Sequence, residues 1–322
     1  MAKPILVLGA SGFVGSRLTR CLLNSGHTVH AASRAPHQLR AMLSGARPVF
    51  ADVDQLDSLR AAMHGVGAVY DLVHLMGGPD SAAFARRELQ AAENLVTAAA
   101  DAGVDRLIYL GGVAPHGTPS PHLRSRLQTG EILRSGPVPT LELRAGMIVG
   151  AQSASWRIVR DLAARLPVMI LPRWLENRSQ PVAIDDVIAA LSFGLEAELP
   201  HSRWSDLPGP DILSSREILN IVARLRGTRP MTVGVPFMTP QMSSYWIAMV
   251  TRADPRLARL LVEGLKTDLL AEGPGLWSEM DDHAPMSFIQ AATLALEEEC
   301  DDLGRRTQLL EGIVRRVSRS AS

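Results

Sequence analysis

The sequence has few of the residues on which several protein classes depend. Its two cysteines, Cys21 and Cys300, are too few for a disulfide framework and fit a reducing compartment. Basic and acidic residues balance at 33 each, so the composition gives no sign of a surface for nucleic acid. No apolar run reaches the ~18 residues of a membrane span, and we see no signal peptide. We therefore expect a cytoplasmic protein with no membrane span and no nucleic-acid partner.

Metal motifs are missing, and lysine and tyrosine are scarce. The sequence contains no Cys-x-x-Cys, no His-Glu-x-x-His and no cluster of histidines and carboxylates at ligand spacing, so we expect no metal site. The only lysines are Lys3 and Lys266. No tyrosine has a lysine four residues later, because the residues four positions after Tyr70, Tyr109 and Tyr245 are His74, Val113 and Met249.

The features that are present begin with a β-α-β pattern at the N-terminus. An apolar run at residues 4–8 precedes "GASGFVG", a helical pattern then extends to Gly26, and a second apolar run covers residues 28–33. Glycines at the first turn allow a tight bend, close approach of a pyrophosphate and close packing of the helix, and the helix N-terminus attracts phosphate. The pattern predicts a dinucleotide site at Gly9, Ser11, Gly12, Phe13, Val14 and Gly15.

The end of the second strand indicates which dinucleotide is bound. An NAD site usually has a carboxylate there for the ribose 2′-hydroxyl, whereas an arginine accommodates a 2′-phosphate. This chain has Ser33 and Arg34 at that point, and no carboxylate lies between Gly15 and Asp52. We expect NADP(H) to be preferred over NAD(H), unless Arg34 is only a solvated loop residue.

The end of the third strand-like run is expected to meet the adenine. Asp52 and Val53 stand there, although Asp52 could equally serve the turn. Asp54 is expected to cap the helix that follows at residues 55–63.

Alternation along the chain predicts the fold class. Strand-like runs at residues 4–8, 28–33, 47–51, 67–73, 106–111 and 138–144 alternate with helical patterns, as in an α/β protein with a Rossmann-type, doubly wound parallel sheet. We expect this dinucleotide-binding domain at residues 1–150. Residues 151–300 would form a smaller C-terminal substrate lobe, interleaved with the last strands of the sheet, and residues 301–322 a basic tail.

Several stretches resemble the short-chain dehydrogenase/reductase superfamily in its atypical and extended branches. They are "GASGFVG", "GVGAVYDLVHLMGG", the helix that contains Asn94, and "LRAGMIVG". More narrowly, "LVHLMGG" and "SPHLRSRLQTGEILR" look like a bacterial subgroup described as NAD(P)H-binding, NmrA-like or sugar-epimerase-like. The resemblance implies that the nicotinamide half of the cofactor lies near Val73, His74, Gly111, Ala145 and Gly146.

The sequence departs from catalytic members of this superfamily at their proton-transfer groups. Those members use a tyrosine four residues before a lysine, and this chain has His122 and Arg126 at the corresponding place. The i, i+4 spacing puts both on one helix face, where His122 could exchange a proton and Arg126 could hold a ribose, a phosphate or the substrate. Alternatively, His122 only opens a helix after Pro121, and Arg126 only binds ribose or a carboxylate.

Two functions are compatible with this pattern. One is an NADPH-dependent oxidoreductase that reduces a small apolar carbonyl, enone or quinone, with a small-molecule substrate as its partner. The other is a catalytically silent NADP(H)-binding redox sensor, or an assembly protein with a regulatory protein partner. An open pocket beside the nicotinamide would favour the enzyme, and a filled one would favour the sensor. The oligomeric state and the role of the apolar stretch 236–250 are not indicated by the sequence.

Overall fold

A computed structural model describes residues 3–74, 81–165, 168–228, 231–235, 267–273 and 275–299 of the 322-residue chain. The apolar stretch 236–250 and the basic tail 301–322 lie outside these residues, as do Tyr245, Lys266 and Cys300.

A seven-stranded sheet forms the centre of the molecule, with the order β11-β6-β5-β4-β1-β2-β3 and every neighbouring pair parallel. Its strands are β1 (Ile5–Leu8), β2 (Val29–Ser33), β3 (Arg47–Phe50), β4 (Ala68–Asp71), β5 (Arg106–Gly112), β6 (Thr140–Ala145) and β11 (Arg203–Asp206). The strand order reverses between β1 and β4, and sheets of this kind bind ligands at the carboxyl ends of the strands at such a point. The predicted doubly wound α/β fold is confirmed.

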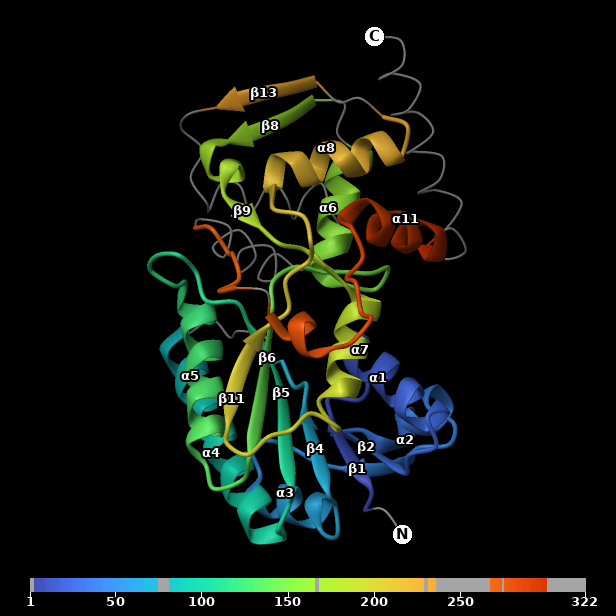
Figure 1. The fold of residues 1–322 in the computed structure, drawn as a ribbon, viewed down its shortest axis with the longest axis vertical. Coiled ribbons are helices and arrows are strands. Elements are labelled where there is room, and N and C mark those ends of the chain that lie inside the picture. The colour runs from blue at the N-terminus through green and yellow to red at the C-terminus, as the bar shows by residue number, and fades with distance from the viewer. Residues whose placement is uncertain are drawn as a thin grey trace.

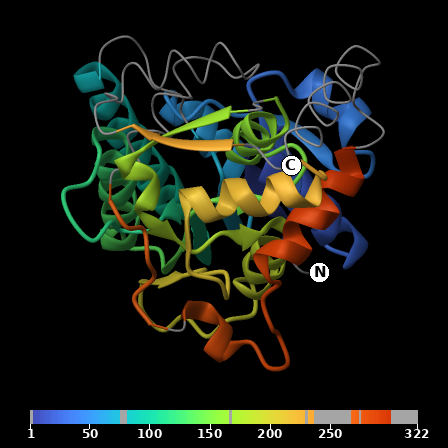
Figure 2. The same cartoon turned by 90° about the horizontal axis from the view of Figure 1, so that it is seen from above.

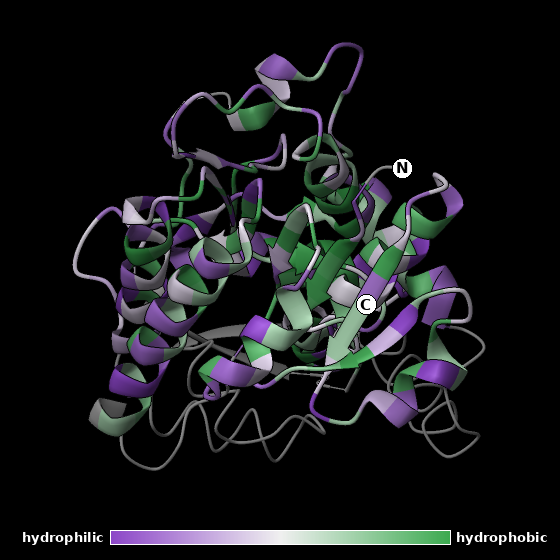
Figure 3. Cartoon of the chain, turned by 90° about the horizontal axis from the view of Figure 1, so that it is seen from below, coloured by the Kyte–Doolittle hydropathy of each residue, from purple (hydrophilic) through white to green (hydrophobic). Residues whose placement is uncertain are grey.

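Helices cover both faces of the sheet, as Figure 1 shows. Helices α1 (Phe13–Asn24), α2 (Pro36–Met42) and α7 (Ile184–Phe193) lie on one face, and α3 (Leu56–Met63), α4 (Ser81–Ala102) and α5 (Pro121–Ser135) lie on the other. Successive residues of a strand point to opposite faces, so Ile5 and Val7 join one core while Leu6 and Leu8 join the other. Hydrophobic strands therefore occupy the middle of the molecule in Figure 3, with hydrophilic positions on the outer sides of the helices.

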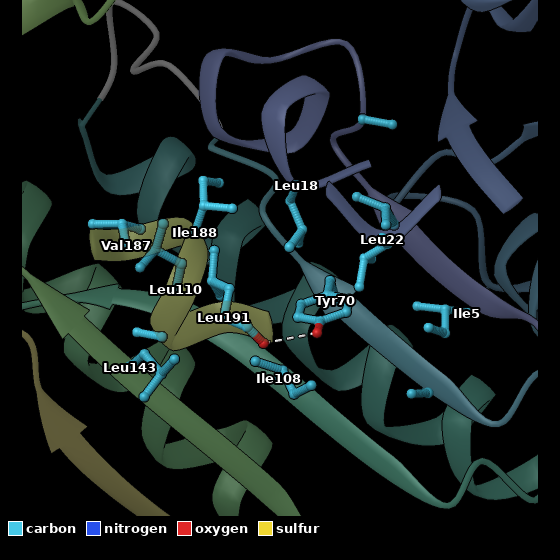
Figure 4. Close-up of a cluster of buried hydrophobic side chains, with 14 of the residues drawn as sticks. Ile5, Leu18, Leu22, Tyr70, Ile108, Leu110, Leu143, Val187, Ile188 and Leu191 are labelled. Carbon is cyan, nitrogen blue, oxygen red and sulfur yellow. Dashed lines mark hydrogen bonds between the residues drawn. The ribbon is translucent and has the colours of Figure 1, made fainter. Parts of the chain in front are cut away.

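The core on the α1 side contains a buried tyrosine. Tyr70 lies among Leu18, Leu22 and Ile108, and its hydroxyl donates to the carbonyl oxygen of Leu191 at 2.8 Å (Figure 4). Burial raises the pKa of this phenol. The hydrogen bond satisfies a polar group inside an apolar core, so Tyr70 serves packing between the sheet and α7.

A smaller lobe lies beyond the carboxyl ends of the strands (Figures 1 and 2). It contains α6 (Ala154–Arg165), α8 (Ser215–Leu225) and α11 (Phe288–Glu299), which pack around the buried Trp156. Three short strand pairs accompany them: β7 (Ile148–Val149) with β10 (Val182–Ala183), β9 (Arg178–Ser179) with β12 (Leu213–Ser214), and β8 (Val168–Pro172) with β13 (Met231–Val235). Short 3₁₀ helices cover Arg173–Glu176 and Gly275–Glu279. The domain boundaries expected at residues 150 and 300 stay predictions.

The predicted cap of α3 is wrong. The helix begins after Gln55, which occupies the N-cap position without a side-chain hydrogen bond. The Asp54 carboxylate instead forms an ion pair with Arg87 of α4, one helix away. The Asp54 carboxylate forms a stronger hydrogen bond with a charged guanidinium than with a neutral backbone N–H group.

Candidate functional site

A cavity of about 930 Å³ follows the carboxyl ends of the strands and continues into the smaller lobe. Every residue that the sequence analysis assigned to the cofactor or to proton transfer lines it: Gly9, Ser11, Gly12, Phe13, Val14, Gly15, Ser33, Arg34, Asp52, Val53, Val73, His74, Gly111, His122, Arg126, Ala145 and Gly146. These residues come from β2, β5, β6, α1 and α5 and from the loops that follow β1, β2, β3, β4 and β6, so the fold brings together positions far apart in the sequence.

The glycine turn after β1 leaves space where a dinucleotide needs it. Gly9 has φ +78°, and a Cβ atom there would lie 2.8 Å from the carbonyl oxygen of Leu72. A Cβ at Gly15 would overlap the carbonyl oxygen of Gly9 and lie 2.8 Å from its carbon. Helix α1 has neither a side-chain cap nor an acidic residue in its first turn. The bare N-terminus and the close turn fit the pyrophosphate of a dinucleotide.

Two side chains line the cavity after β2, where the sequence analysis expects the ribose. Ser33 Oγ accepts from the N–H of Ala35 at 3.0 Å, which fixes the turn that presents Arg34. The Arg34 side chain is exposed, lines the cavity and, among the described residues, pairs with no carboxylate. An unpaired guanidinium at this point suits a phosphate group.

The part of the cavity after β3, where the sequence analysis expects the adenine, combines a turn with an unpredicted ion pair between Asp54 and Arg87. Asp52 lines the cavity, yet its carboxylate also accepts from the N–H of Asp54 at 3.2 Å and from Gln55 Nε2 at 3.3 Å, so it holds the turn after β3. Arg87 lines the same end of the cavity. The sequence analysis did not predict it, because no sequence feature distinguishes Arg87 from the other charged residues of α4. Asn94 of the same helix donates to the carbonyl oxygen of Val53 at 3.0 Å and ties α4 to this loop.

Three side chains meet where β4, β5 and α5 converge. Arg126 donates to Nδ1 of His74 at 3.1 Å and to the carbonyl oxygen of Leu110, and its guanidinium lies 5.0 Å from the centre of the Tyr109 ring. The rings of His74 and His122 meet edge to face with their centres 5.0 Å apart. The predicted shared face of His122 and Arg126 is thus present, and it contacts His74 of another element.

The local sequence explains how α5 presents this face. Pro121 occupies the first turn of the helix, and Ser120 Oγ caps it by accepting from the N–H of Leu123 at 3.3 Å. His122 therefore also lies in the first turn of a helix after Pro121, as the alternative interpretation expected. The helix start and the cavity wall are the same segment.

Burial and charge alter the acid–base behaviour of groups around Arg126. His74 is exposed toward the cavity, yet neighbouring protein atoms desolvate part of its imidazole. That desolvation, the Arg126 charge and the nearby His122 lower the pKa of His74, so its imidazole is neutral at neutral pH. Burial raises the pKa of Asp71 to about 6, against the opposing effects of the Val73 N–H and Arg126, and burial also raises the pKa of Glu88.

Neither described tyrosine lines the cavity. The Tyr109 hydroxyl donates to the carbonyl oxygen of Arg126 at 3.4 Å, and burial raises the pKa of this phenol, as it does for Tyr70. Lys3 precedes β1, at the amino-terminal edge of the sheet, where it pairs with Asp105. None of these groups lines the cavity, although Tyr109 contacts Arg126, which does.

The part of the cavity in the smaller lobe is an apolar chamber, whose wall residues the sequence analysis did not identify. Its wall consists of Ile158, Val159 and Leu162 of α6, Ile218 and Leu219 of α8, and Leu175 and Leu269. Hydroxyl groups of Ser153, Ser155, Ser179 and Ser215 line the same part of the cavity. Apolar residues at helical spacing, such as Ile158 and Leu162, have the same sequence pattern whether they face a hydrophobic core or a cavity. The sequence therefore could not indicate the chamber wall.

Two kinds of site are absent from the part of the chain that the structure describes. No three histidine, cysteine, aspartate or glutamate side chains gather as metal ligands would. No helix in the same part combines the length and the apolar character required to cross a membrane.

Comparison with known proteins identifies the domain and the fold. Residues 9–161 match the protein family described as NAD(P)H-binding. The chain is 34% identical over 118 residues to a 3β-hydroxysteroid dehydrogenase/Δ5→4-isomerase of Mycobacterium tuberculosis, a match that covers 33% of this chain and 30% of that protein. It is 24% identical over 241 residues to the photosystem II assembly factor Ycf39 of Cyanophora paradoxa, covering 72% of this chain and 71% of the relative.

Solved structures share the fold over most of the chain. The triphenylmethane reductase of Citrobacter sp., in complex with NADP(H), superposes with a TM-score of 0.71 at 16% identity and covers 91% of this chain and 99% of its own. Nucleotide-sugar epimerases have the same fold. The chain spans only about 30% of the length of the steroid dehydrogenases that it matches. Residues 9–161 of the protein therefore match an NAD(P)H-binding domain, and the chain has the Rossmann-type fold of these solved structures.

Proposed function

We propose that this protein is an NADP(H)-dependent oxidoreductase that reduces a small apolar carbonyl, enone or quinone. One observation carries the proposal: a single cavity joins the glycine turn after β1 to the apolar chamber and passes His74 and Arg126 on the way. When bound, the cofactor would supply a hydride, one proton with two electrons, to the acceptor carbon, and the acceptor oxygen would take its proton from His122 or water. An open chamber at that point favours the enzyme over the sensor.

The residues of the cavity divide this work. The N-terminus of α1 would hold the pyrophosphate and Arg34 the 2′-phosphate, which gives the preference for NADP(H). The Arg126 guanidinium would lie near the acceptor oxygen, where its fixed charge stabilises the negative charge that develops during reduction. The apolar chamber would bury an apolar acceptor and exclude water, which strengthens those electrostatic interactions.

The described wall of the chamber favours an apolar acceptor over a sugar nucleotide. A diphosphate needs arginine, lysine or backbone N–H groups to offset its charge. The described residues of the chamber wall include no charged side chain. Epimerase chemistry in this superfamily also relies on the tyrosine and lysine pair, whose spacing is missing from the sequence.

A second candidate is a catalytically silent NADP(H)-binding protein that senses redox state or assists assembly. Gly111 and Gly112 stand where the superfamily has a serine. The missing serine and the missing tyrosine and lysine pair together would weaken proton transfer. The similarity to an assembly factor over 72% of this chain agrees with this reading.

The deciding experiment is a fluorescence titration of the purified protein with NADPH and NADH, followed by stopped-flow mixing of the NADPH complex with quinones, enones and ketones. Oxidation of bound NADPH by an acceptor supports the reductase and identifies its substrate class. Tight binding of NADPH without oxidation by any acceptor favours the silent protein. No binding of either dinucleotide would contradict both.

The same titration tests the assigned role of Arg34. Replacing Arg34 with glutamate should weaken NADPH binding by about tenfold to a hundredfold, because a charge-assisted hydrogen bond contributes roughly 1.5–3 kcal/mol. NADH, which lacks the phosphate, should lose little. Arg40→Glu is the matched control, since Arg40 is an exposed arginine of α2 outside the cavity wall. Equal losses for NADPH and NADH would remove Arg34 from phosphate binding.

A further inference from the structure

We propose that His74 acts as a fixed hydrogen-bond donor to the acceptor oxygen, through Nε2–H, and that the site is consequently selective for quinones and conjugated enones over isolated ketones. The inference deepens the proposed reductase function and rests on it. It concerns a residue that the superfamily's tyrosine and lysine chemistry does not include, and it follows from the contact between His74 and Arg126.

The contact fixes the position of the single proton of a neutral imidazole. A guanidinium has only donors, so the nitrogen atom 3.1 Å from Arg126 must accept. That atom is Nδ1, and the proton of a neutral His74 is therefore on Nε2. Nδ1 is occupied by Arg126 and the ring lines the cavity, so Nε2–H is the polar group that His74 has left for a ligand.

Arg126 is itself held in place, which makes the geometry around His74 rigid. Its guanidinium donates to the carbonyl oxygen of Leu110 and lies over the Tyr109 ring. His122 contacts the other side of the His74 ring edge to face. A donor that is oriented before the ligand arrives requires no reorganisation when charge develops, and this preorganisation is the main source of oxyanion stabilisation in enzymes.

The charges around His74 keep the imidazole neutral. Arg126 and His122 of α5 face it directly, and a second cation beside Arg126 would be repelled. Asp71 of β4, Glu88 of α4 and Tyr109 of β5 lie within the electrostatic reach of Arg126. The pKa of His74 is lowered in this setting, so the imidazole is not protonated at neutral pH and does not serve as the proton source.

A neutral donor suits some acceptors better than others. When a hydride reaches an isolated ketone, the oxygen becomes a strongly basic alkoxide, which needs an acid during the transfer. When a hydride reaches a quinone or a conjugated enone, the electron pair is delocalised in a phenolate or an enolate, and hydrogen bonds suffice. The anion then takes its proton from water, which leaves hydroxide, so atoms and charges balance without a protein acid.

The tautomer can be measured without turnover. The full-length protein, labelled with ¹⁵N-histidine, should show His74 as the neutral Nε2–H form from about pH 5 to 8, a range in which an ordinary histidine titrates. The spectrum of His74→Gln assigns the resonance. In Arg126→Gln the pKa of His74 should rise, because one of the charges that lower it is removed, while desolvation still holds it below the ordinary value. A protonated His74, or a proton on Nδ1, at neutral pH would overturn the inference.

Selectivity is tested by stopped-flow oxidation of bound NADPH with benzoquinone, cyclohexenone and cyclohexanone. The wild type should reduce the first two and leave cyclohexanone unreacted, at rates that do not change with pH from about 5.5 to 8. His74→Leu should lose about tenfold to a thousandfold in rate, as removal of an oxyanion donor does, and His74→Gln should restore part of it. An NADPH titration of both variants separates a loss of cofactor affinity from a loss of rate at saturating NADPH.

The outcomes separate the inference from the proposed function. A wild-type rate in His74→Leu, or reduction of cyclohexanone as fast as benzoquinone, overturns the inference while the protein remains a reductase. If none of the three acceptors oxidises the bound NADPH, the protein is not a reductase of this kind, and the claim of selectivity fails as well. The NMR measurement decides the tautomer in either case.

Discussion

At the residue scale, two glycines of the "GASGFVG" turn have different roles that a single methyl group can separate. A Cβ at Gly15 would meet the backbone of Gly9 and lie 3.0 Å from Cα of Ala10, and backbone atoms cannot move aside. A Cβ at Gly12 would lie 3.2 Å from the carbonyl oxygen of Gly9, a contact that a small shift relieves. Gly15 is thus required by the fold, whereas the fold leaves room for a Cβ at Gly12, which we expect the proposed cofactor to need.

Urea unfolding and NADPH titration of the two alanine variants test this difference. Gly15→Ala should lower the free energy of unfolding by about 1–3 kcal/mol, the usual cost of overpacking, and should lose NADPH binding. Gly12→Ala should change the unfolding free energy by less than about 1 kcal/mol, yet weaken NADPH binding, because its methyl group meets the pyrophosphate. The assignment fails if Gly15→Ala is as stable as the wild type or if Gly12→Ala binds NADPH unchanged.

Single residues of the site were predictable where a strand ends or where a motif marks the start of a helix, as in α1 and α5, and unpredictable in α4. Arg34 and His74 follow strands, and the carboxyl ends of parallel strands meet at one edge of the sheet, so their place in the cavity follows from topology. Arg87 lies in a helix with several charged residues, and only its register against the sheet selects it. The contact between Arg126 and His74 joins residues 52 positions apart, which no local pattern predicts.

At the element scale, α5 docks on the sheet around a buried carboxylate. Glu142 of β6 has no exposed surface and accepts from Arg134 of α5 at 2.8 Å and from Arg144 at 2.9 Å. Gly130 of α5 faces this carboxylate, and a Cβ there would overlap it. A glycine in mid-helix normally weakens the helix by about 1 kcal/mol relative to alanine, so here it is kept for the space it leaves.

The sign of the stability change in Gly130→Ala distinguishes the need for space beside Glu142 from the higher helix propensity of alanine. Gly130→Ala should lower the unfolding free energy by about 1–3 kcal/mol, because the methyl group displaces the Glu142 carboxylate from its arginine partners. If helix propensity dominated, the same change would raise stability. Gln128→Ala, at an exposed position of the same helix, is the control and should change stability by less than about 0.5 kcal/mol. Thermal and urea unfolding measure both.

Elements were predictable in proportion to their apolar patterning. The first six strands of the sheet are apolar runs between glycines and helices, and the structure has them where the runs are. Strand β11 reads "RWSD", with a charge at each end, so it lacks that signal. It completes the sheet because Trp204 lies against the Arg144 guanidinium at 4.2 Å and its backbone pairs with β6. The two-residue strands of the smaller lobe are too short to show an alternation of apolar and polar residues.

At the scale of the whole molecule, the edge of the sheet that carries the cavity also buries carboxyl groups. Burial raises the pKa of Asp71, Glu88 and Asp206, and of Asp186 and Glu299 in the segments that pack against the smaller lobe. A carboxyl whose pKa is raised on folding is stabilised in its protonated form, in contrast to one that gains a salt bridge. The contribution of these carboxyls to the free energy of unfolding should therefore fall as pH rises, whereas His74, whose pKa is lowered, contributes in the opposite direction.

Asp71 allows this response to be measured at one group. Its side chain is 9% exposed and accepts from the N–H of Val73 at 3.2 Å, and burial raises its pKa from 3.8 to about 6. Between these values the folded chain holds a proton that the unfolded chain has released. Its contribution to the unfolding free energy therefore falls as pH rises from about 4 to 6, and stays low above that.

Asp71→Asn keeps the hydrogen bond from Val73 and removes the charge. The difference of about two pKa units corresponds to about 3 kcal/mol, so the variant should be more stable than the wild type at about pH 7 by up to that amount. Near pH 4.5, where the wild-type carboxyl is protonated when folded, the two should differ by less than about 1 kcal/mol. Urea unfolding at both pH values gives the difference, and the other buried carboxyls cancel because both proteins contain them. An asparagine variant less stable than the wild type at neutral pH would mean that the Asp71 charge is needed to balance Arg126, and that the active edge of the sheet is held together by that attraction.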